Sequence, residues 1–325
     1  MQRRTLLSAL AAAGASTAAP WASAQADYPN QLIRWVVPYP AGGGTDVLAR
    51  TVAEAMRQTL GQQIVVDNRP GASTNIGGQA VATAKADGYT IMSADNAILA
   101  YNEHLFSKLP FSPQNDFTYV GGISRFPLAL VVHPSFEAKT MKEFLAYVRA
   151  NPGKVNYASP GNGSPHHLAM EMFKNRTKTF LTHIPYRGAA PAMADVMGGQ
   201  VPCMFLDLAS GLSVIQSGKV RALAIGSAKR IATLPDVPTL GEVGVADTEV
   251  FAFQGILGPK GLPASVTQRL NADLNKALAS PAVVKRMQDF GMEALPGTPE
   301  QFRALARAEA KRWGEVIKAA GVKLD

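Results

Sequence analysis

The chain has 325 residues, of which 47% are apolar and 17% charged, and it contains three tryptophans and a single cysteine, Cys203. This is the composition of an ordinary globular protein long enough for two lobes, so it excludes a disordered or fibrous chain and an internal disulfide. The formal net charge of +8 does not indicate nucleic-acid binding, because lysines and arginines are scattered among acidic residues without a basic run.

The first 24 residues are typical of an export signal. They have a basic start at Arg3-Arg4, a small apolar stretch and an Ala22-Ser23-Ala24 cleavage pattern before Gln25. Leu6-Leu7-Ser8 replaces the usual continuation of a twin-arginine motif, so the Sec and twin-arginine routes both stay open. Cleavage removes two arginines and no acid, which lowers the formal charge from +8 to +6. We therefore expect a periplasmic protein, without a membrane span in its mature part.

The elements alternate between strand and helix from residue 32 onwards. Residues 32–38 predict a buried strand, and residues 47–60 predict a helix with apolar residues at helical spacing that ends at Gly61. Residues 63–66 predict a strand, 79–84 a short helix after a GASTNIGG loop, and 90–93 another strand. This alternation indicates a parallel sheet with helical crossovers.

The middle of the chain predicts a second unit of the same kind. Its expected strands and helices, in chain order, are 128–133, 140–150 (helix), 155–158, 167–174 (helix), 182–186, 189–197 (helix), 203–206 and 220–227. A Pro-rich surface segment, 234–244, precedes a returning strand at 250–259 and three helices at 265–279, 282–290 and 299–320. The chain crosses between the two units near residues 121–126 and 249–254. We therefore expect lobe 1 to comprise residues 25–124 and 252–325, and lobe 2 residues 125–251, with a clamshell motion between them.

Two glycine-rich loops, VVPYPAGGGTD at 36–46 and NYASPGNGSPHH at 156–167, each connect a strand to a helix. The first turn of a helix leaves backbone N–H groups unpaired and carries partial positive charge, so such a loop attracts an anion. In the second loop Ser164 is placed as an N-cap and Pro165 as the first helical residue. One such loop is as readily explained as a tight turn, but one in each lobe predicts a shared carboxylate site beyond the strand ends.

Enzyme motifs are missing from the sequence. The triple glycine at 42–44 lacks the Lys-Ser/Thr of a phosphate loop, and neither G-x-G-x-x-G nor G-x-S-x-G occurs. His166-His167 with Glu171 does not form a known metal motif, and a histidine that hydrogen-bonds a ligand is the favoured interpretation, so no cofactor or metal is expected. Asp46 is either a first-turn acid that complements the helix dipole or a ligand contact. Asp207 either orients a loop or recognises an amine.

The residues resemble a known family over nearly all of the mature chain. Stretches such as YPNQLIRWVVPYPAGGGTDVLAR, VDNRPGASTNIGG, YASPGNGSPHHLAMEMF and IPYRGAAPAMADVMGGQVPCMF, and the ending WGEVIKAAGVKLD, match in order and spacing the Bug-type extracytoplasmic solute-binding proteins of tripartite tricarboxylate transport systems. The family often has Pro-Gly-Gly where this chain has Ala41-Gly42-Gly43, which leaves the backbone donors and alters the stiffness of the loop.

The resemblance implies an α/β fold of the type II-like, two-lobed periplasmic binding class (Venus flytrap). Each lobe is then a mainly parallel sheet flanked by helices, and two hinge strands join the lobes. A carboxylate is implied between the two glycine loops, held partly through ordered waters. The ligand-binding residues expected from the loops and the strand ends that border the cleft are Tyr39, Ala41, Gly42, Gly43, Gly44, Thr45, Asp46, Ser73, Asn75, Asn96, Ser159, Gly161, Asn162, Gly163, Ser164, His166, Arg187, Gly188, Asp207 and Phe253.

The functional hypothesis is capture of a dicarboxylate or aromatic carboxylate by a monomer, which delivers it to the membrane permease of a tripartite transporter. An alternative is that the loaded protein signals to a sensor kinase. A third class, an exported hydrolase, is disfavoured because a nucleophile motif is missing.

Overall fold

The computed structural model describes residues 28–42, 44–245 and 248–325. The expected signal peptide and Gly43 lie outside these ranges. The first part of the chain forms β1 (Ile33–Val37), α1 (Gly44–Leu60), β2 (Ile64–Asn68), η1 (Ala72–Thr74), α2 (Asn75–Ala82), β3 (Thr90–Asp95), η2 (Ala97–Tyr101), α3 (Asn102–Leu105) and the long β4 (Phe117–Val132). The middle forms α4 (Met141–Ala150), β5 (Asn156–Ser159), α5 (Pro165–Thr177), β6 (Thr182–Pro185), α6 (Ala189–Met197), β7 (Cys203–Asp207), α7 (Leu208–Gln216) and β8 (Arg221–Ile225). The last part forms β9 (Phe251–Pro259), α8 (Ala264–Leu278), α9 (Pro281–Asp289), β10 (Glu293–Ala294) and α10 (Pro299–Ala320).

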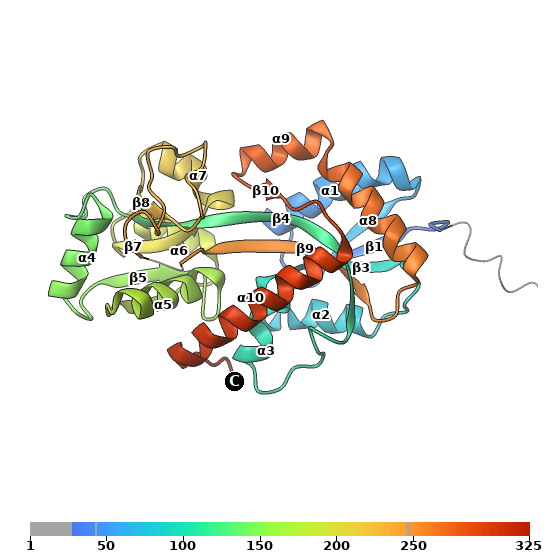
Figure 1. Cartoon of the computed structure of the whole chain (residues 1–325), viewed down its shortest axis with the longest axis horizontal. Coiled ribbons are helices and arrows are strands. Elements are labelled where there is room, and N and C mark those ends of the chain that lie inside the picture. Colours follow the sequence, from blue (N-terminus) through green and yellow to red (C-terminus); the bar gives the residue numbers. More distant parts are fainter. Residues whose placement is uncertain (1–27, 43, 246–247) are drawn as a thin grey trace, which may run out of the picture.

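The strand β4 joins two sheets and so makes the fold two-lobed (Figure 1). Its residues from Phe117 to Pro127 pair with β9, and those from Leu128 to Val132 pair with β7 and β8. In the first lobe the strands follow the order β2-β1-β3-β9-β4, and in the second β6-β5-β7-β4-β8. The parallel strands β2-β1-β3 of the first lobe thus correspond to β6-β5-β7 of the second. In each lobe an antiparallel strand follows, β9 in the first and β4 in the second. The two lobes repeat one topology, in the α/β periplasmic binding class expected from the resemblance.

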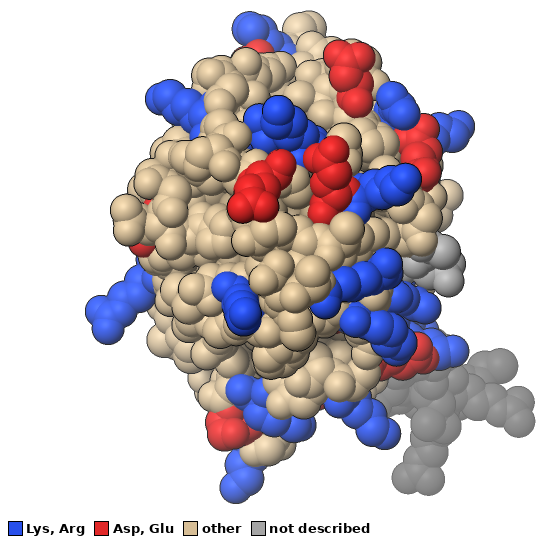
Figure 2. All heavy atoms as spheres, turned by 90° about the vertical axis from the view of Figure 1, so that its left-hand side faces the viewer, with Lys and Arg blue, Asp and Glu red and all other residues tan. Residues whose placement is uncertain are grey.

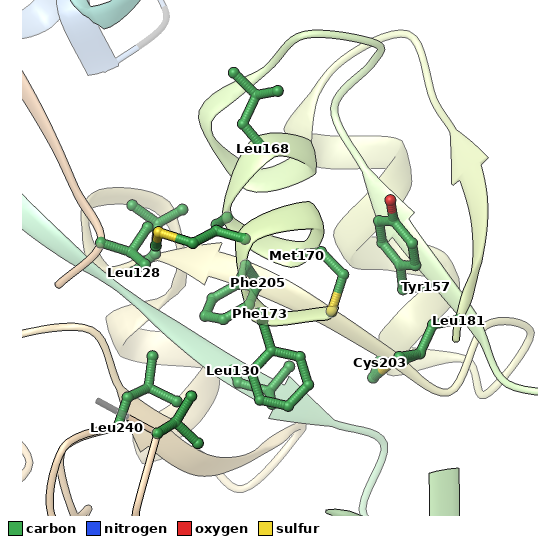
Figure 3. Close-up of a cluster of buried hydrophobic side chains, with 14 of the residues drawn as sticks. Leu128, Leu130, Tyr157, Leu168, Met170, Phe173, Leu181, Cys203, Phe205 and Leu240 are labelled. Atoms are coloured by element: carbon green, nitrogen blue, oxygen red, sulfur yellow. The ribbon is translucent and has the colours of Figure 1, made fainter. Parts of the chain in front are cut away.

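The hydrophobic core follows from the alternation of side chains along these strands. Along β4, Leu128 and Leu130 belong to one cluster of buried side chains and Ala129 and Val131 to another, so the strand is covered on both faces. Figure 3 shows the first of these clusters, in which aromatic and aliphatic side chains of α5, β4 and β7 interlock. Buried aliphatic and aromatic side chains of this size each stabilise the fold by about 1.5–3 kcal/mol.

Helix α10 crosses both lobes (Figure 1). A capping box between Thr298 and Gln301 begins the helix, and Gly321 ends it in the left-handed conformation that glycine adopts without strain. Near its start Phe302 packs with first-lobe side chains, whereas Trp313 in its second half belongs to the same buried cluster as Leu128 and Leu130 of β4. The division of the chain into lobes at residues 124–125 and 251–252 stays a prediction.

Several element boundaries differ from the sequence predictions. Helix α1 begins at Gly44, three residues earlier than expected. β4 runs unbroken over 16 residues, from Phe117 to Val132, where a strand at 128–133 and a separate crossing near 121–126 were predicted. The segments η2–α3 and α7 were not predicted as helical. In α7 the sequence LASGLSVIQ has little helical preference, but Gly211 lies so close to Leu206 of β7 that a Cβ atom would come within 2.4 Å of that side chain. Tertiary packing, which the local sequence does not encode, forms this helix.

Charges are distributed as the sequence suggested on the end face of the second lobe. Figure 2 shows Lys and Arg interspersed there with Asp and Glu, without one continuous basic patch. Among the described residues, no helix combines the length and the apolar character that a membrane span requires.

Candidate ligand-binding site

Strand directions bring both glycine loops to the junction between the lobes. β1 is parallel to β3, β3 is antiparallel to β9, and β9 is antiparallel to β4, so β1 runs in the same direction as β4, toward the second lobe. β7 is antiparallel to β4 and parallel to β5, so β5 runs back toward the first lobe. The loops that follow β1 and β5 therefore both lie at the junction between the lobes. The starts of α1, α5, α6 and α7 lie at the same junction.

The first loop is held by the buried carboxylate of Asp46, which is 2% exposed. Its Oδ2 accepts a hydrogen bond from the Gly42 N–H at 2.9 Å, its Oδ1 accepts one from Asn68 at 2.9 Å, and Arg50 binds both oxygens at 3.0–3.1 Å. Burial raises the pKa of Asp46, but the hydrogen bonds from Arg50, Gly42 and Asn68 outweigh it and hold this pKa below its ordinary value. Because both carboxylate oxygens are bonded within the protein, this geometry favours a structural role for Asp46, which supports the loop, over a ligand contact.

Other candidates of the first lobe flank this loop. Tyr39 is partly buried, and its hydroxyl donates to Asp95 at the end of β3. Ala41 and Gly44 are exposed, and Thr45 is half-buried in the first turn of α1. In that turn the first N–H groups have no acceptor within the helix.

Ser73 and Asn75 lie in the next loop of the first lobe. The Ser73 carbonyl and the Asn75 side chain both accept hydrogen bonds from Asn102, at 2.7 and 2.8 Å. Ser73 is exposed and has a positive φ of 48°, a conformation that costs a non-glycine residue free energy, whereas Asn75 is buried.

Asn96 and Phe253 are part of the packed interior. The Asn96 side chain is 0% exposed, accepts the Phe253 N–H at 2.7 Å and donates to Tyr101 and to the Phe251 carbonyl. Phe253 is also 0% exposed, with its ring against Phe251 and Phe302. In this conformation neither side chain presents a surface to a ligand, so we leave both out of the proposed site.

The second loop has the helix cap that the sequence predicted. The Ser164 Oγ accepts the His167 N–H at 3.3 Å, and Pro165 is the first residue of α5. The glycine amides of this loop are already engaged: Gly161 N–H donates to Ser159 Oγ at 3.1 Å, and Gly163 N–H donates to His167 Nδ1 at 3.0 Å. These amides therefore shape the loop. Pro165 has no N–H and the Ser164 cap binds the His167 N–H, so the first turn of α5 offers a ligand the His166 N–H.

His166, in the first turn of α5, and Asp207, the last residue of β7, form a buried pair. The His166 Nε2 lies 3.0 Å from Asp207 Oδ2, and Asp207 also caps α7 by accepting the Ser210 N–H at 2.8 Å. Burial raises the pKa of Asp207, but hydrogen bonds from His166 and Ser210 hold it below its ordinary value, so Asp207 is ionised. The ionised carboxylate fixes the proton on Nε2, and the opposite nitrogen, Nδ1, is buried without a partner among the described residues.

The remaining candidates complete the edge of the second lobe. Gly188 precedes α6 with a φ of 119°, and its N–H donates to the Pro160 carbonyl at 3.0 Å, which ties the β6 loop to the glycine loop. Arg187 and Asn162 are exposed beside it.

A groove of about 600 Å³ lies elsewhere, between residues 226–233 and 288–293. The groove borders both edges of β4: β8 lies along the edge that β9 pairs with, and β10 pairs with the opposite edge, which β7 also uses. Two of its cations are already paired, Arg125 with Glu293 at 2.9 Å and Arg230 with Glu242 at 3.0 Å. None of the predicted ligand residues lines it, and we do not assign it as the ligand site.

The residues that brace the loops were not predicted from the sequence. Arg50, Asn68 and Asn102 hold the first-lobe loops, and His167 and His183 hold the second. Their partners are up to 29 residues away in the chain. The spacing of Asp46 and Arg50 at i,i+4 on a helix was the one local signal for any of them.

The sequence of the chain matches that of known proteins. Residues 48–322 match the model of the tripartite tricarboxylate transporter family receptor. The chain is 38% identical over 291 residues to a protein from the tcbD-tcbE intergenic region of Pseudomonas sp. (strain P51), with 89% of this chain and 86% of that protein covered. It is 37% identical over 298 residues to BugT of Bordetella pertussis, with 91% of each chain covered.

Two solved structures that resemble this one were determined with carboxylates. A Rhodopseudomonas palustris protein with adipate superimposes with a TM-score of 0.83 at 33% identity, covering 91% of this chain and 99% of that one. MatC of the same organism, with bound malate, gives a TM-score of 0.79 at 32% identity, covering 89% and 100%.

The chain therefore belongs to the tripartite tricarboxylate transporter receptor family, as the resemblance predicted. Proteins of this family are periplasmic solute-binding proteins and not enzymes, so the hydrolase alternative is set aside.

Proposed function

We propose that this protein captures a small dicarboxylate or aromatic carboxylate at the junction of its lobes and delivers it to the permease of a tripartite transporter. The observation that carries the proposal is that helix starts from both lobes lie at the junction between them. Each helix start carries partial positive charge and unpaired N–H donors, which favour a carboxylate. The adipate and malate bound by two similar proteins support the same ligand class.

The His166–Asp207 pair supports a second polar contact with the ligand. A buried polar atom without a partner costs about 1–3 kcal/mol. We infer that Nδ1 of His166, which is buried and unpaired in this conformation, becomes accessible when the lobes open and then accepts or donates a hydrogen bond to the ligand. Neutral His166 accepts there from a hydroxyl or an amine, and protonated His166 donates to a carboxylate. We also include Tyr39, which follows β1, and Arg187, which follows β6, among the residues proposed to border the ligand.

Closure of the lobes completes the proposed mechanism. We infer that the lobes move against each other about the β4 crossing, near residues 121–126, and the return at residues 249–254. The ligand favours the closed form only by as much as it binds that form more tightly than the open one. We further propose export by a cleaved signal at residues 1–24 and a monomeric state.

A thermal-shift screen tests the proposed function. The purified mature chain is heated with a panel of dicarboxylates and aromatic carboxylates, including adipate and malate, and with matched neutral diamides as controls. A true ligand at 100 times its dissociation constant adds about 2.7 kcal/mol to the free energy of unfolding and raises the melting temperature. A panel in which no acid raises the melting temperature more than its diamide contradicts the proposal.

A further inference from the structure

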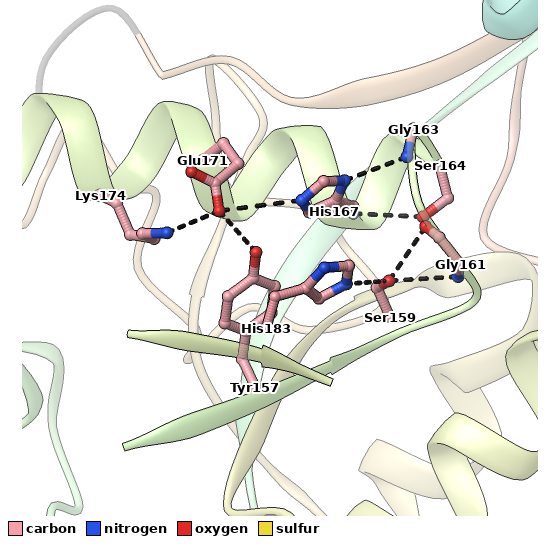
Figure 4. A network of polar contacts seen from close by, with 9 residues as sticks. All are labelled: Tyr157, Ser159, Gly161, Gly163, Ser164, His167, Glu171, Lys174 and His183. Carbon is pink, nitrogen blue, oxygen red and sulfur yellow. Dashed lines mark hydrogen bonds and ion pairs between the residues drawn. The ribbon is translucent and has the colours of Figure 1, made fainter. Parts of the chain in front are cut away.

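Two stacked histidines lie directly behind the second glycine loop (Figure 4). His167 of α5 and His183 of β6 have ring centroids 3.9 Å apart and planes within 5° of parallel. Tyr157 of β5 stacks on His183 at 4.8 Å. His167 is 6% exposed and His183 is half-buried, so the stack belongs to the interior edge of the lobe.

The hydrogen bonds fix the tautomer of His167. The Gly163 N–H lies 3.0 Å from His167 Nδ1. A backbone amide only donates, so Nδ1 carries a free lone pair and the proton of the neutral ring is on Nε2. The Nε2 atom lies 3.8 Å from the Glu171 carboxylate, which favours a proton at that position.

His183 supports the other glycine of the loop through a serine. Its Nε2 lies 2.6 Å from Ser159 Oγ, and this hydroxyl accepts the Gly161 N–H at 3.1 Å. Both glycine amides of the loop are therefore anchored, directly or through Ser159, to the two stacked rings. Gly161 and Gly163 have φ values of 143° and 72°, so the chain between them adopts a turn that few other residues tolerate and that needs an anchor.

We propose that His167 and His183 are positioning residues, whose neutral rings hold the second glycine loop in the form that presents the start of α5 to the ligand. This inference rests on the proposed function, because it concerns the same ligand site. It assigns to these two side chains a role in affinity although neither is proposed to touch the ligand.

The surrounding charges set how the stack responds to acid. Glu171 and Lys174 face the stack from α5, 2.6 Å from each other, and Tyr157 donates to Glu171 from β5. Burial lowers the pKa of His167 to about 4, with Glu171 opposing and Lys174 adding to this effect. Burial and the neighbouring His167 lower the pKa of His183 to about 4 as well. Protonation of His167 would turn Nδ1 into a donor facing the Gly163 N–H, so acid should release the loop.

The test compares two substitutions of one ring. His167→Leu removes the acceptor, whereas the Oδ1 of His167→Asn occupies the position of Nδ1 and accepts the same N–H without titrating. Affinity for adipate and malate is measured by calorimetry at pH 7.5, with His133→Asn, on the far side of the lobe beside Ser135, as the control. We expect His167→Leu to bind about tenfold more weakly, as for the loss of one buried hydrogen bond, and the other two variants to stay within about threefold of the wild type.

Two results would overturn the inference: wild-type affinity in His167→Leu, or an equal loss in His167→Asn. Nuclear magnetic resonance of the ligand-free wild type gives an independent answer if His167→Leu fails to fold. We expect a bare Nδ1 and a protonated Nε2 on His167 at pH 7.5, with the Gly163 amide shifting only below about pH 5. A proton on Nδ1, or a titration near the ordinary histidine pKa, contradicts the inference. If the wild type binds neither acid, the proposed function fails for this class, and the resonance experiment still decides how the loop is held.

Discussion

The two glycine loops occupy equivalent positions in the two lobes but are held by different chemistry. In the first loop the Gly42 N–H donates to the charged carboxylate of Asp46, which Arg50 and Asn68 also bind. In the second loop the N–H groups of Gly163 and Gly161 donate to neutral groups, the imidazole of His167 and the hydroxyl of Ser159. A repeated topology thus fixes where a loop must be rigid, but not which side chains make it rigid. We therefore expect different substitutions and different pH ranges to weaken the two loops.

Removal of the Asp46 carboxylate should have the largest effect. Asp46→Ala leaves the Gly42 N–H and Asn68 without their acceptor, so we expect the free energy of unfolding to fall by about 2–3 kcal/mol at pH 7.5 and ligand affinity to fall with it. The matched control is Asp289→Ala, which removes an exposed i,i+4 pair with Lys285. That variant should change stability by less than about 0.5 kcal/mol. Equal losses in both variants, measured by urea denaturation, would show that Asp46 does not brace the loop.

The two loops should lose stability in different pH ranges. A histidine whose folded pKa is lowered from 6.5 to about 4 takes up its proton more readily when unfolded, so stability falls as the pH drops from 6.5 toward 4. The Asp46 pKa is lowered from 3.8, so its contribution is present above that value and is lost only at lower pH. We therefore expect the second loop to loosen first.

Thermal unfolding of the wild type and His167→Asn between pH 7 and 4 measures this difference. The wild type should lose melting temperature more steeply below pH 6.5 than the variant, because the variant lacks one titrating ring. Parallel curves would mean that His167 keeps an ordinary pKa in the folded protein.

A pair of left-handed glycines gives the smallest expected effect. Gly42 and Gly61 have φ values of 84° and 73°, and a Cβ atom would meet nothing within 4 Å at either position. Both Gly42→Ala and Gly61→Ala should therefore cost about 1–2 kcal/mol of stability through the backbone alone. Only Gly42→Ala should also weaken ligand binding, because Gly61 merely ends α1 far from the junction. Calorimetry that finds equal affinities for the two variants would remove Gly42 from the site.

Local chemistry explains which parts of the structure the sequence predicted. The cap at Ser164 and Pro165 is set by neighbouring residues, and the helix at 299–320 is set by its own periodicity, so both were predicted correctly. The bracing contacts were not predicted, because His183 reaches Ser159 across 24 residues and Asn68 reaches Asp46 across 22. Pairing of that kind depends on strand order, which periodicity does not encode. For the same reason Asn96 was placed in a loop, whereas the structure buries it against β9.

A crystal structure of the mature protein with the best acid from the thermal-shift screen would show where the ligand binds. We expect the carboxylate to lie between residues 39–46 and 159–166, near the first turns of α1 and α5, with His166 Nδ1 hydrogen-bonded to the ligand. A ligand seated in the groove between residues 226–233 and 288–293, with the glycine loops untouched, would contradict this expectation.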